Sequence, residues 1–261
     1  RANNDVVRKI MHKERFIPII SEYSLSSISA SQKEDYETMF PGSVYTGGTG
    51  SFNVANAFVI GDEVVTDNGY LYTINQVIEP LETIYAEMNK ENSDYTQFAK
   101  MYDRFVVYQY DEDATRDYGN GDSLFVHSHN ILPPIACEWT NFYNLSTPDY
   151  AQMNYLTSVS YAVLAPDNKS INQFFQKYWS ASFSSLEEVN FVPLYHFMNE
   201  HAIRYGGGMI GAYALGSYIV NNDIWDDHQL AMPTDVKVCS NGILGGMKDN
   251  VITPEVFETP I

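Results

Sequence analysis

Two short motifs occur twice in this 261-residue chain, in the same order and at nearly the same separation. The segment FIPII begins at Phe16, and its counterpart FVPLY begins at Phe191, 175 residues later. The segment NGYLYTINQVIEP begins at Asn68, and NGILGGMKDNVITP begins at Asn241, 173 residues later. Matching order and a nearly constant offset predict a repeated structural module, which constrains the fold more than any single element does.

The repeat also predicts where the modules begin and end. The first copy closes at Pro80, and a helical pattern starts at Leu81. We therefore expect residues 1–80 to form the C-terminal half of a first module and residues 81–261 to form a complete second module, with an insertion near 111–155. The second copy contains YAVLAPDN, from Tyr161, whose counterpart would lie upstream of Arg1.

Residue spacing predicts a mixture of helices and strands. Apolar residues recur at helical spacing in 84–88 and 95–102, and Ser93 or Asp94 is expected to cap the second of these helices. Aromatic and β-branched runs at 104–110 and 123–129 predict two strands, joined by a long acidic loop. We expect a strand at 159–166 and a helix after it, capped by Asp167 or Asn168.

Later elements follow from turn and helix signals. The segment PLYHFMNEHAI predicts a helix with Pro193 near its start, where a missing N–H is tolerated. Each Asn-Gly pair predicts a tight turn with positive φ, followed by a final strand. The residues from Met209 to Pro254 alternate and turn repeatedly, which indicates mostly β structure.

The ordered motifs resemble the signatures of a fasciclin domain. YAVLAPDN is similar to its strand-to-helix segment T-V-F-A-P-T-N. NGYLYTINQVIEP resembles its terminal signature N-G-V-I-H-V-I-D-x-V-L-x-P, with Tyr72 in place of the His and Asn75 in place of the Asp. Tyr195 and His196 match the family's Tyr-His pair, and the first copy lacks that pair. The second terminal segment departs further, because it carries one extra residue.

This resemblance implies an α+β fold, a β-sandwich or wedge of strands with helices packed on one side, as one complete module plus a truncated one. It also implies adhesion or matrix binding outside the cell. Acidic two-module versions resemble lipid-anchored surface proteins of Gram-negative bacteria, so an extracellular, outer-surface or periplasm-facing location is expected. A lipid anchor is expected upstream of Arg1.

Composition excludes several classes of partner. Fifteen basic against 33 acidic residues give a formal charge of −18, which repels nucleic-acid phosphates and anionic lipids. No window of the sequence has the ~18–20 uninterrupted apolar residues of a membrane span. Cys137 and Cys239 are the only cysteines, and either a disulfide or two buried thiols fits the sequence.

Two segments contain candidate ligand-binding residues. Because the Tyr-His region of animal relatives is associated with receptor engagement, the resemblance implies a binding role for Tyr195 and His196. The favoured alternative is that His196 is buried and fixes the neighbouring loop by hydrogen bonds. The segment WDDH, made of Trp225, Asp226, Asp227 and His228, would suit sugar stacking or acid-base chemistry. A turn capped by Asp is the simpler interpretation of WDDH.

Two further segments are weak metal candidates, and we expect neither a metal nor any other cofactor. Asp111, Asp113, Thr115, Asp117 and Asp122 have the spacing of a calcium loop, but Arg116 stands where an EF-hand needs Gly. A solvated acidic loop is the favoured alternative. His127 and His129 share one face of a predicted strand and would chelate zinc or copper with a third ligand. The sequence shows no third ligand, so a surface or hydrogen-bonding role is favoured for both.

Together these features predict a non-catalytic binding or adhesion protein that recognises a protein or a glycan. One alternative is a carbohydrate-active hydrolase that uses Asp226 with Asp227 or Glu187 with Glu188. Neighbouring carboxylates on a strand point to opposite faces, which argues against both pairs. A structural spacer subunit of a surface complex is the third hypothesis.

Overall fold

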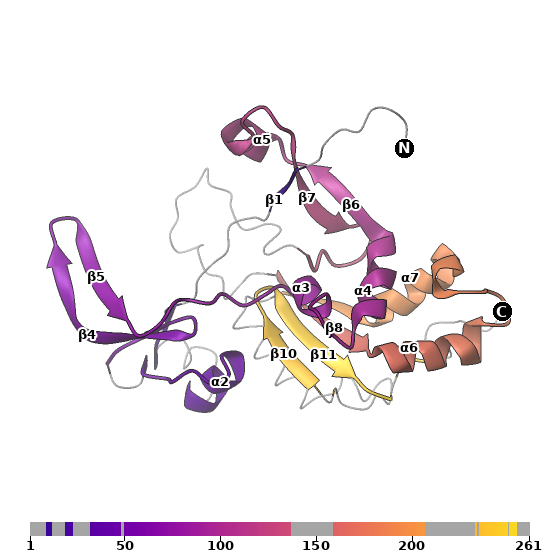
Figure 1. The fold of residues 1–261 in the computed structure, drawn as a ribbon, viewed down its shortest axis with the longest axis horizontal. Helices are drawn as coiled ribbons and strands as arrows, with labels where there is room; N and C mark the ends of the chain where they lie inside the picture. Colours follow the sequence, from indigo (N-terminus) through magenta and orange to yellow (C-terminus); the bar gives the residue numbers. More distant parts are fainter. Residues whose placement is uncertain are drawn as a thin grey trace.

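The computed structural model describes residues 9–11, 19–22, 32–47, 50–136, 159–206, 233, 235–249 and 251–254. Within these ranges the chain forms three separate sheets and a series of short helices (Figure 1). None of the three described sheets closes into a barrel. The predicted mixed α+β class is therefore confirmed.

The first sheet is built around the strand-to-helix junction. Its strands, in spatial order, are β10 (Asp235–Cys239), β11 (Gly242–Met247), β8 (Val159–Pro166) and β9 (Ala202–Gly206). β8 runs parallel to β11 and antiparallel to β9. Asp167 follows β8 and caps α6 (Asn168–Phe174), because its side chain accepts a hydrogen bond from Ser170 N–H at 2.7 Å. The predicted strand, helix and cap are all confirmed.

Helices gather beside this sheet and enclose the main core. They are α3 (Ile84–Met88), α4 (Thr96–Tyr102), α6 with a π-helical turn at Phe175–Trp179, and α7 (Phe191–Glu200). A 3₁₀ turn, η6, spans Leu186–Glu188. Phe98, Phe174 and Phe197, one from each of α4, α6 and α7, pack in one cluster with Val163 and Leu244 of the sheet. The helical pattern predicted for this half of the chain therefore marks the face that is buried.

One predicted helix cap is wrong. Tyr95 occupies the N-cap position of α4, and neither Ser93 nor Asp94 does. The first turn of α4 instead receives its acceptor from α6, because Gln97 N–H donates to Asn168 Oδ1 at 2.8 Å. The acceptor comes from a residue 71 positions away, so local sequence could not reveal it.

The second sheet has the order β1 (Lys9–Met11), β7 (Leu124–His129) and β6 (Val106–Tyr110). A 3₁₀ turn, η2 (Asp103–Phe105), connects α4 to β6. The segment between β6 and β7 is not the expected loop, because it contains the helix α5 (Glu112–Tyr118). Asp111 caps α5 by accepting from Ala114 N–H at 2.9 Å, and Arg116 pairs with Asp113 and Asp117.

The third sheet has the order β2 (Ile19–Ile20), β3 (Asn53–Val54), β4 (Ala57–Thr66) and β5 (Gly69–Ile74). Near it, α2 (Gln32–Met39) contributes Tyr36 and Met39 to a second, smaller core. The hydroxyl of Tyr36 donates to Ala55 O at 2.9 Å. The long β4–β5 hairpin projects away from the other elements (Figure 1).

The two Asn-Gly segments have the same local structure. Thr66 pairs with Gly69 and Cys239 pairs with Gly242, so each turn has two residues and each is followed by a six-residue strand. The predicted turns and strands are confirmed, but Asn68 and Asn241 do not have positive φ. Gly242 has a φ of +150°, and a Cβ there would lie 1.8 Å from Tyr161 O of β8. The glycine therefore permits close approach of β8 and β11.

The other repeated motif differs between its two copies. Ile19 and Ile20, which end FIPII, form strand β2, whereas Leu194 and Tyr195 of FVPLY lie within helix α7. β2 is held by antiparallel pairing with β3, so a strand partner decides its conformation. Sequence similarity at this motif is therefore not matched by local structure.

Candidate functional site

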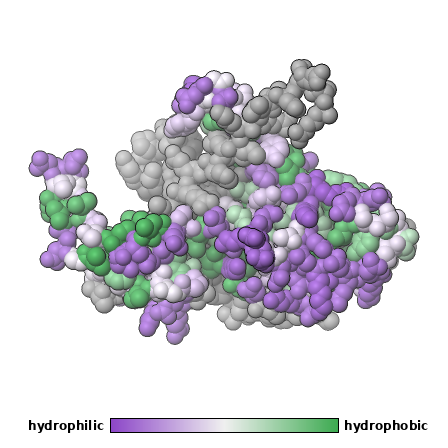
Figure 2. All heavy atoms as spheres, in the orientation of Figure 1, coloured by the Kyte–Doolittle hydropathy of each residue, from purple (hydrophilic) through white to green (hydrophobic). Residues whose placement is uncertain are grey.

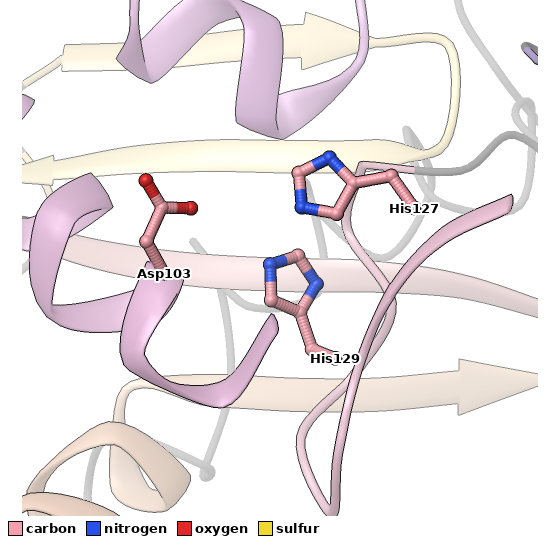
Figure 3. A group of neighbouring side chains, drawn as sticks. All are labelled: Asp103, His127 and His129. Carbon is pink, nitrogen blue, oxygen red and sulfur yellow. The ribbon is translucent and has the colours of Figure 1, made fainter. Parts of the chain in front are cut away.

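Two histidines of β7 and an aspartate of η2 form a compact group. His127 and His129 share a face because side chains two apart on a strand point the same way. Val106 of β6 pairs with His129, so the η2 turn just before β6 brings Asp103 beside the two rings. One potential ligand atom from each of the three residues lies within 4.8 Å of the others. Figure 3 shows the Asp103 carboxylate directed toward the two imidazoles.

Tyrosines surround this Asp-His-His group. The ring centroids of Tyr85 and His127 are 4.9 Å apart, and those of Tyr102 and His129 are 4.6 Å apart, both with edge-to-face geometry. The hydroxyl of Tyr85 donates a hydrogen bond to the Asp103 carboxylate. The group is therefore flanked by aromatic rings, and one of its acidic oxygens is oriented by a neighbouring hydroxyl.

Burial sets the charge of the group. His129 is 5% exposed, and burial, with the nearby His127, lowers its pKa to about 3. Its imidazole is therefore neutral near pH 7. Burial raises the pKa of Asp103, which the Tyr85 hydrogen bond and His127 partly oppose. Asp103 also stands at the C-terminal end of α4, where the helix dipole disfavours an anion.

The surface or hydrogen-bonding role favoured for the two histidines does not fit His129, which is buried. Among the described residues, neither ring nitrogen of His129 has a hydrogen-bond partner, and the same holds for Oδ1 of Asp103. The sequence showed no third ligand because Asp103 lies 24 residues before His127. Only the β6–β7 register, interrupted by α5, reveals that it is a neighbour.

The other predicted site residues do not join this group. Tyr195 is partly buried against the main core and His196 is exposed on α7, so the expectation of a buried, loop-fixing His196 is wrong. Within the described ranges, Asp103, His127 and His129 are the one set of three metal-ligating side chains close enough to share an ion. The calcium candidates, which are Asp111, Asp113, Asp117 and Asp122, therefore do not converge. Trp225, Asp226, Asp227 and His228 lie outside the described residues.

The paired glutamates proposed for a hydrolase also do not meet in one cleft. A cleft of about 360 Å³ between α4, α6 and η6 includes Glu187, beside Lys100 and Arg104, but not Glu188. Hydrogen bonding from Ser185 lowers the pKa of Glu187, so its carboxylate is ionised and is a poor general acid. Glu188 instead accepts a hydrogen bond from the hydroxyl of Ser184.

A separate feature is the β4–β5 arm, by which we mean residues 57–74. Its apolar side chains are exposed on both faces: Val65 and Tyr70 are 69% and 65% exposed on one face, and Val64 and Leu71 are 54% and 60% exposed on the other. Figure 2 shows hydrophobic residues along this arm. Isolated two-stranded hairpins are marginally stable in water, and large exposed apolar patches are uncommon on monomeric proteins. Among the described residues, this arm is therefore a candidate interaction surface.

Comparison of the chain with known protein families, with curated proteins and with solved structures found no match. In the described part of the chain, no helix has the length and apolar character required to cross a bilayer. Cys239 is a buried free thiol, and Cys137 lies outside the described residues.

Proposed function

We propose that the chain is a non-catalytic binding protein and that the β4–β5 arm is the surface with which it binds a protein partner. The observation that carries the proposal is the exposure of Val64, Val65, Tyr70 and Leu71 on the two faces of a projecting hairpin. Burial of apolar surface drives most protein association, and tyrosine is enriched among the residues that dominate binding energy.

The two repeat copies suggest how the partner binds. Strand β11, after the second Asn-Gly, lies between β10 and β8, and all six of its residues are buried. Strand β5, after the first Asn-Gly, is the last strand of its sheet among the described residues, and its residues are exposed or partly exposed. An extended segment that pairs with β5 as β8 pairs with β11 would cover this edge by strand addition.

Charge indicates the chemistry of the partner. The arm carries Asp62, Glu63 and Asp67 and has no Lys or Arg. A second copy of this arm would bring like charges together, which disfavours self-association. The partner we propose is a protein that presents an extended, apolar segment with Lys or Arg at its ends. A glycan is disfavoured because the exposed arm is largely aliphatic.

We also propose a boundary between two modules near Pro80 and an extracellular location for the protein. The fully buried residues of the small core, such as Ile20, Tyr36 and Ala55, precede Pro80, and those of the main core begin at Ile84, which supports a boundary near Pro80. Leu81 and Val238 pack against the small core from beyond this boundary, so the two parts are in contact there. The fasciclin resemblance favours an extracellular or outer-surface location, where an exposed recognition arm would reach its partner.

The test is a titration of the full chain with a synthetic peptide that carries the β8 sequence VSYAVLAP between added lysines, followed by fluorescence anisotropy. We expect this peptide to bind the chain. The double substitution Val65→Lys and Tyr70→Lys should weaken binding at least about tenfold, because it removes apolar contacts of the arm. A tenfold loss of affinity corresponds to ~1.4 kcal/mol. Val192→Lys, at an exposed apolar position of α7, is the matched control and should change nothing.

Two control peptides test the mode of binding. A peptide with proline at its centre cannot complete the strand hydrogen bonds, and one with glutamates in place of lysines would be repelled. Equal binding by all three peptides, or no effect of the two arm substitutions, would refute recognition by the arm. A glycan array signal lost with the same substitutions would instead identify a carbohydrate as the partner.

A further inference from the structure

We propose that Asp103, His127 and His129 bind a single divalent transition-metal ion of the zinc type. This inference concerns η2 and β7 and is independent of the β4–β5 arm. It rests on three groups whose ligand atoms lie within 4.8 Å of one another. It also rests on the lack, among the described residues, of hydrogen-bond partners for both ring nitrogens of His129 and for Oδ1 of Asp103.

The chemistry of the donors fits a metal better than it fits a packed core. Buried polar groups are almost always hydrogen-bonded, yet both ring nitrogens of the buried His129 lack partners among the described residues. Oδ1 of Asp103 also lacks a partner among the described residues, and Asp103 stands at a helix end that disfavours negative charge. A divalent cation would satisfy one ring nitrogen of His129 and Oδ1 of Asp103, and it would compensate the carboxylate charge.

The geometry requires only small movements. Zinc bonds of about 2.0–2.2 Å to nitrogen and oxygen place tetrahedral ligand atoms ~3.3–3.6 Å apart. Ligand atoms now within 4.8 Å would therefore approach by at most about 1.5 Å, which rotation about the side-chain torsions of Asp103 and the two rings can supply.

The surroundings also match a metal centre. Carboxylate ligands are usually held by a second group, and here the Tyr85 hydroxyl donates to Asp103. Two imidazoles and one carboxylate select zinc and its neighbours over calcium and magnesium, which prefer oxygen ligands. Three protein ligands leave a fourth position open in tetrahedral geometry. The ion would tie the end of α4 to β7.

The test is calorimetric titration of zinc into the full chain after removal of metals with a chelator. We expect one zinc ion per chain. Asp103→Asn and His127→Gln should each weaken binding at least about 100-fold, since loss of a supporting group alone costs 10–100-fold. Tyr85→Phe, which removes only the hydrogen bond to Asp103, should weaken binding about tenfold. Circular dichroism will verify that each variant is folded.

His196→Gln is the matched control, because this exposed histidine of α7 lies outside the group. Cobalt supplies an independent readout, since its visible absorption bands should change in His127→Gln and not in His196→Gln. The assignment is overturned if zinc does not bind stoichiometrically. It is also overturned if Asp103→Asn and His127→Gln still bind zinc, because that result is expected for adventitious binding to the acidic surface. Equal affinity for magnesium or calcium would also overturn it.

Discussion

The buried His201 links the stability of the main core to pH. His201 is fully buried at the end of α7, where its Nδ1–H donates to Phe197 O at 2.7 Å. Its Nε2 accepts from Ile252 N–H at 3.4 Å, so the neutral ring satisfies both partners. A second proton on Nε2 would face the Ile252 donor. Burial accordingly lowers the pKa of His201 to about 4 from an ordinary value of 6.5.

This shift predicts acid sensitivity with a defined sign. Between pH 6.5 and about 4 the unfolded chain binds a proton at this residue and the folded chain does not. The free energy of unfolding should therefore fall as pH drops through this window, by about 3 kcal/mol from this group, and the contribution should level off below pH 4. Urea unfolding at several pH values measures it. His201→Asn keeps a donor for Phe197 O, and its free energy of unfolding should depend less steeply on pH. An unchanged dependence would show that His201 does not cause the acid sensitivity.

At the level of elements, the junction between β8 and α6 organises two helices. Asp167 caps α6 itself, while the next residue, Asn168, gives its Oδ1 to Gln97 N–H in the first turn of α4. Asn168 N–H also donates to Asp94 O at 2.7 Å, which fixes the approach to α4. The start of α6 therefore positions both α6 and α4 over the main core, and α4 in turn leads to Asp103.

Asn168→Ala should destabilise the protein by about 1–2 kcal/mol, because it removes the acceptor for an otherwise unpaired N–H at the start of α4. At this chain length that corresponds to a fall in Tm of roughly 2–4 °C for each kcal/mol. Asn172→Ala, on the exposed side of α6, is the matched control and should have little effect. A similar Tm for the two variants would show that the cap contributes nothing.

Elements that depend on neighbouring residues could mostly be predicted from the sequence, and those that depend on distant contacts could not. The run VSYAVLAP followed by Asp167 contains both the strand pattern and the cap, so β8 and α6 could be read directly. Helix α5 was missed because its acidic residues and following glycines resemble a loop, although Asp111 supplies a cap. His127 and His129 were recognised from their spacing, but Asp103 was not, because its position depends on pairing between β6 and β7 across α5.

The whole molecule carries a large excess of negative charge. Thirty-three acidic residues face only 15 basic ones, and several described cations already contact carboxylates, as in the pairs Lys169–Asp249 and Lys237–Glu87. Such surface pairs contribute little, so most of the carboxylates are not compensated. Self-repulsion of this kind favours solubility and opposes the compact state.

Screening should therefore stabilise the fold. Raising NaCl from about 10 mM to about 0.3 M shortens the Debye length from ~30 Å to below ~10 Å, which weakens repulsion between separated carboxylates more than attraction within contact pairs. We expect Tm to rise by several degrees, with roughly 2–4 °C for each kcal/mol gained. Differential scanning calorimetry in the presence of a chelator measures this without a contribution from bound metal. KCl should give the same rise, since screening depends on ionic strength alone. A Tm that stays constant or falls would mean that the described ion pairs outweigh the net repulsion, despite the formal charge of −18.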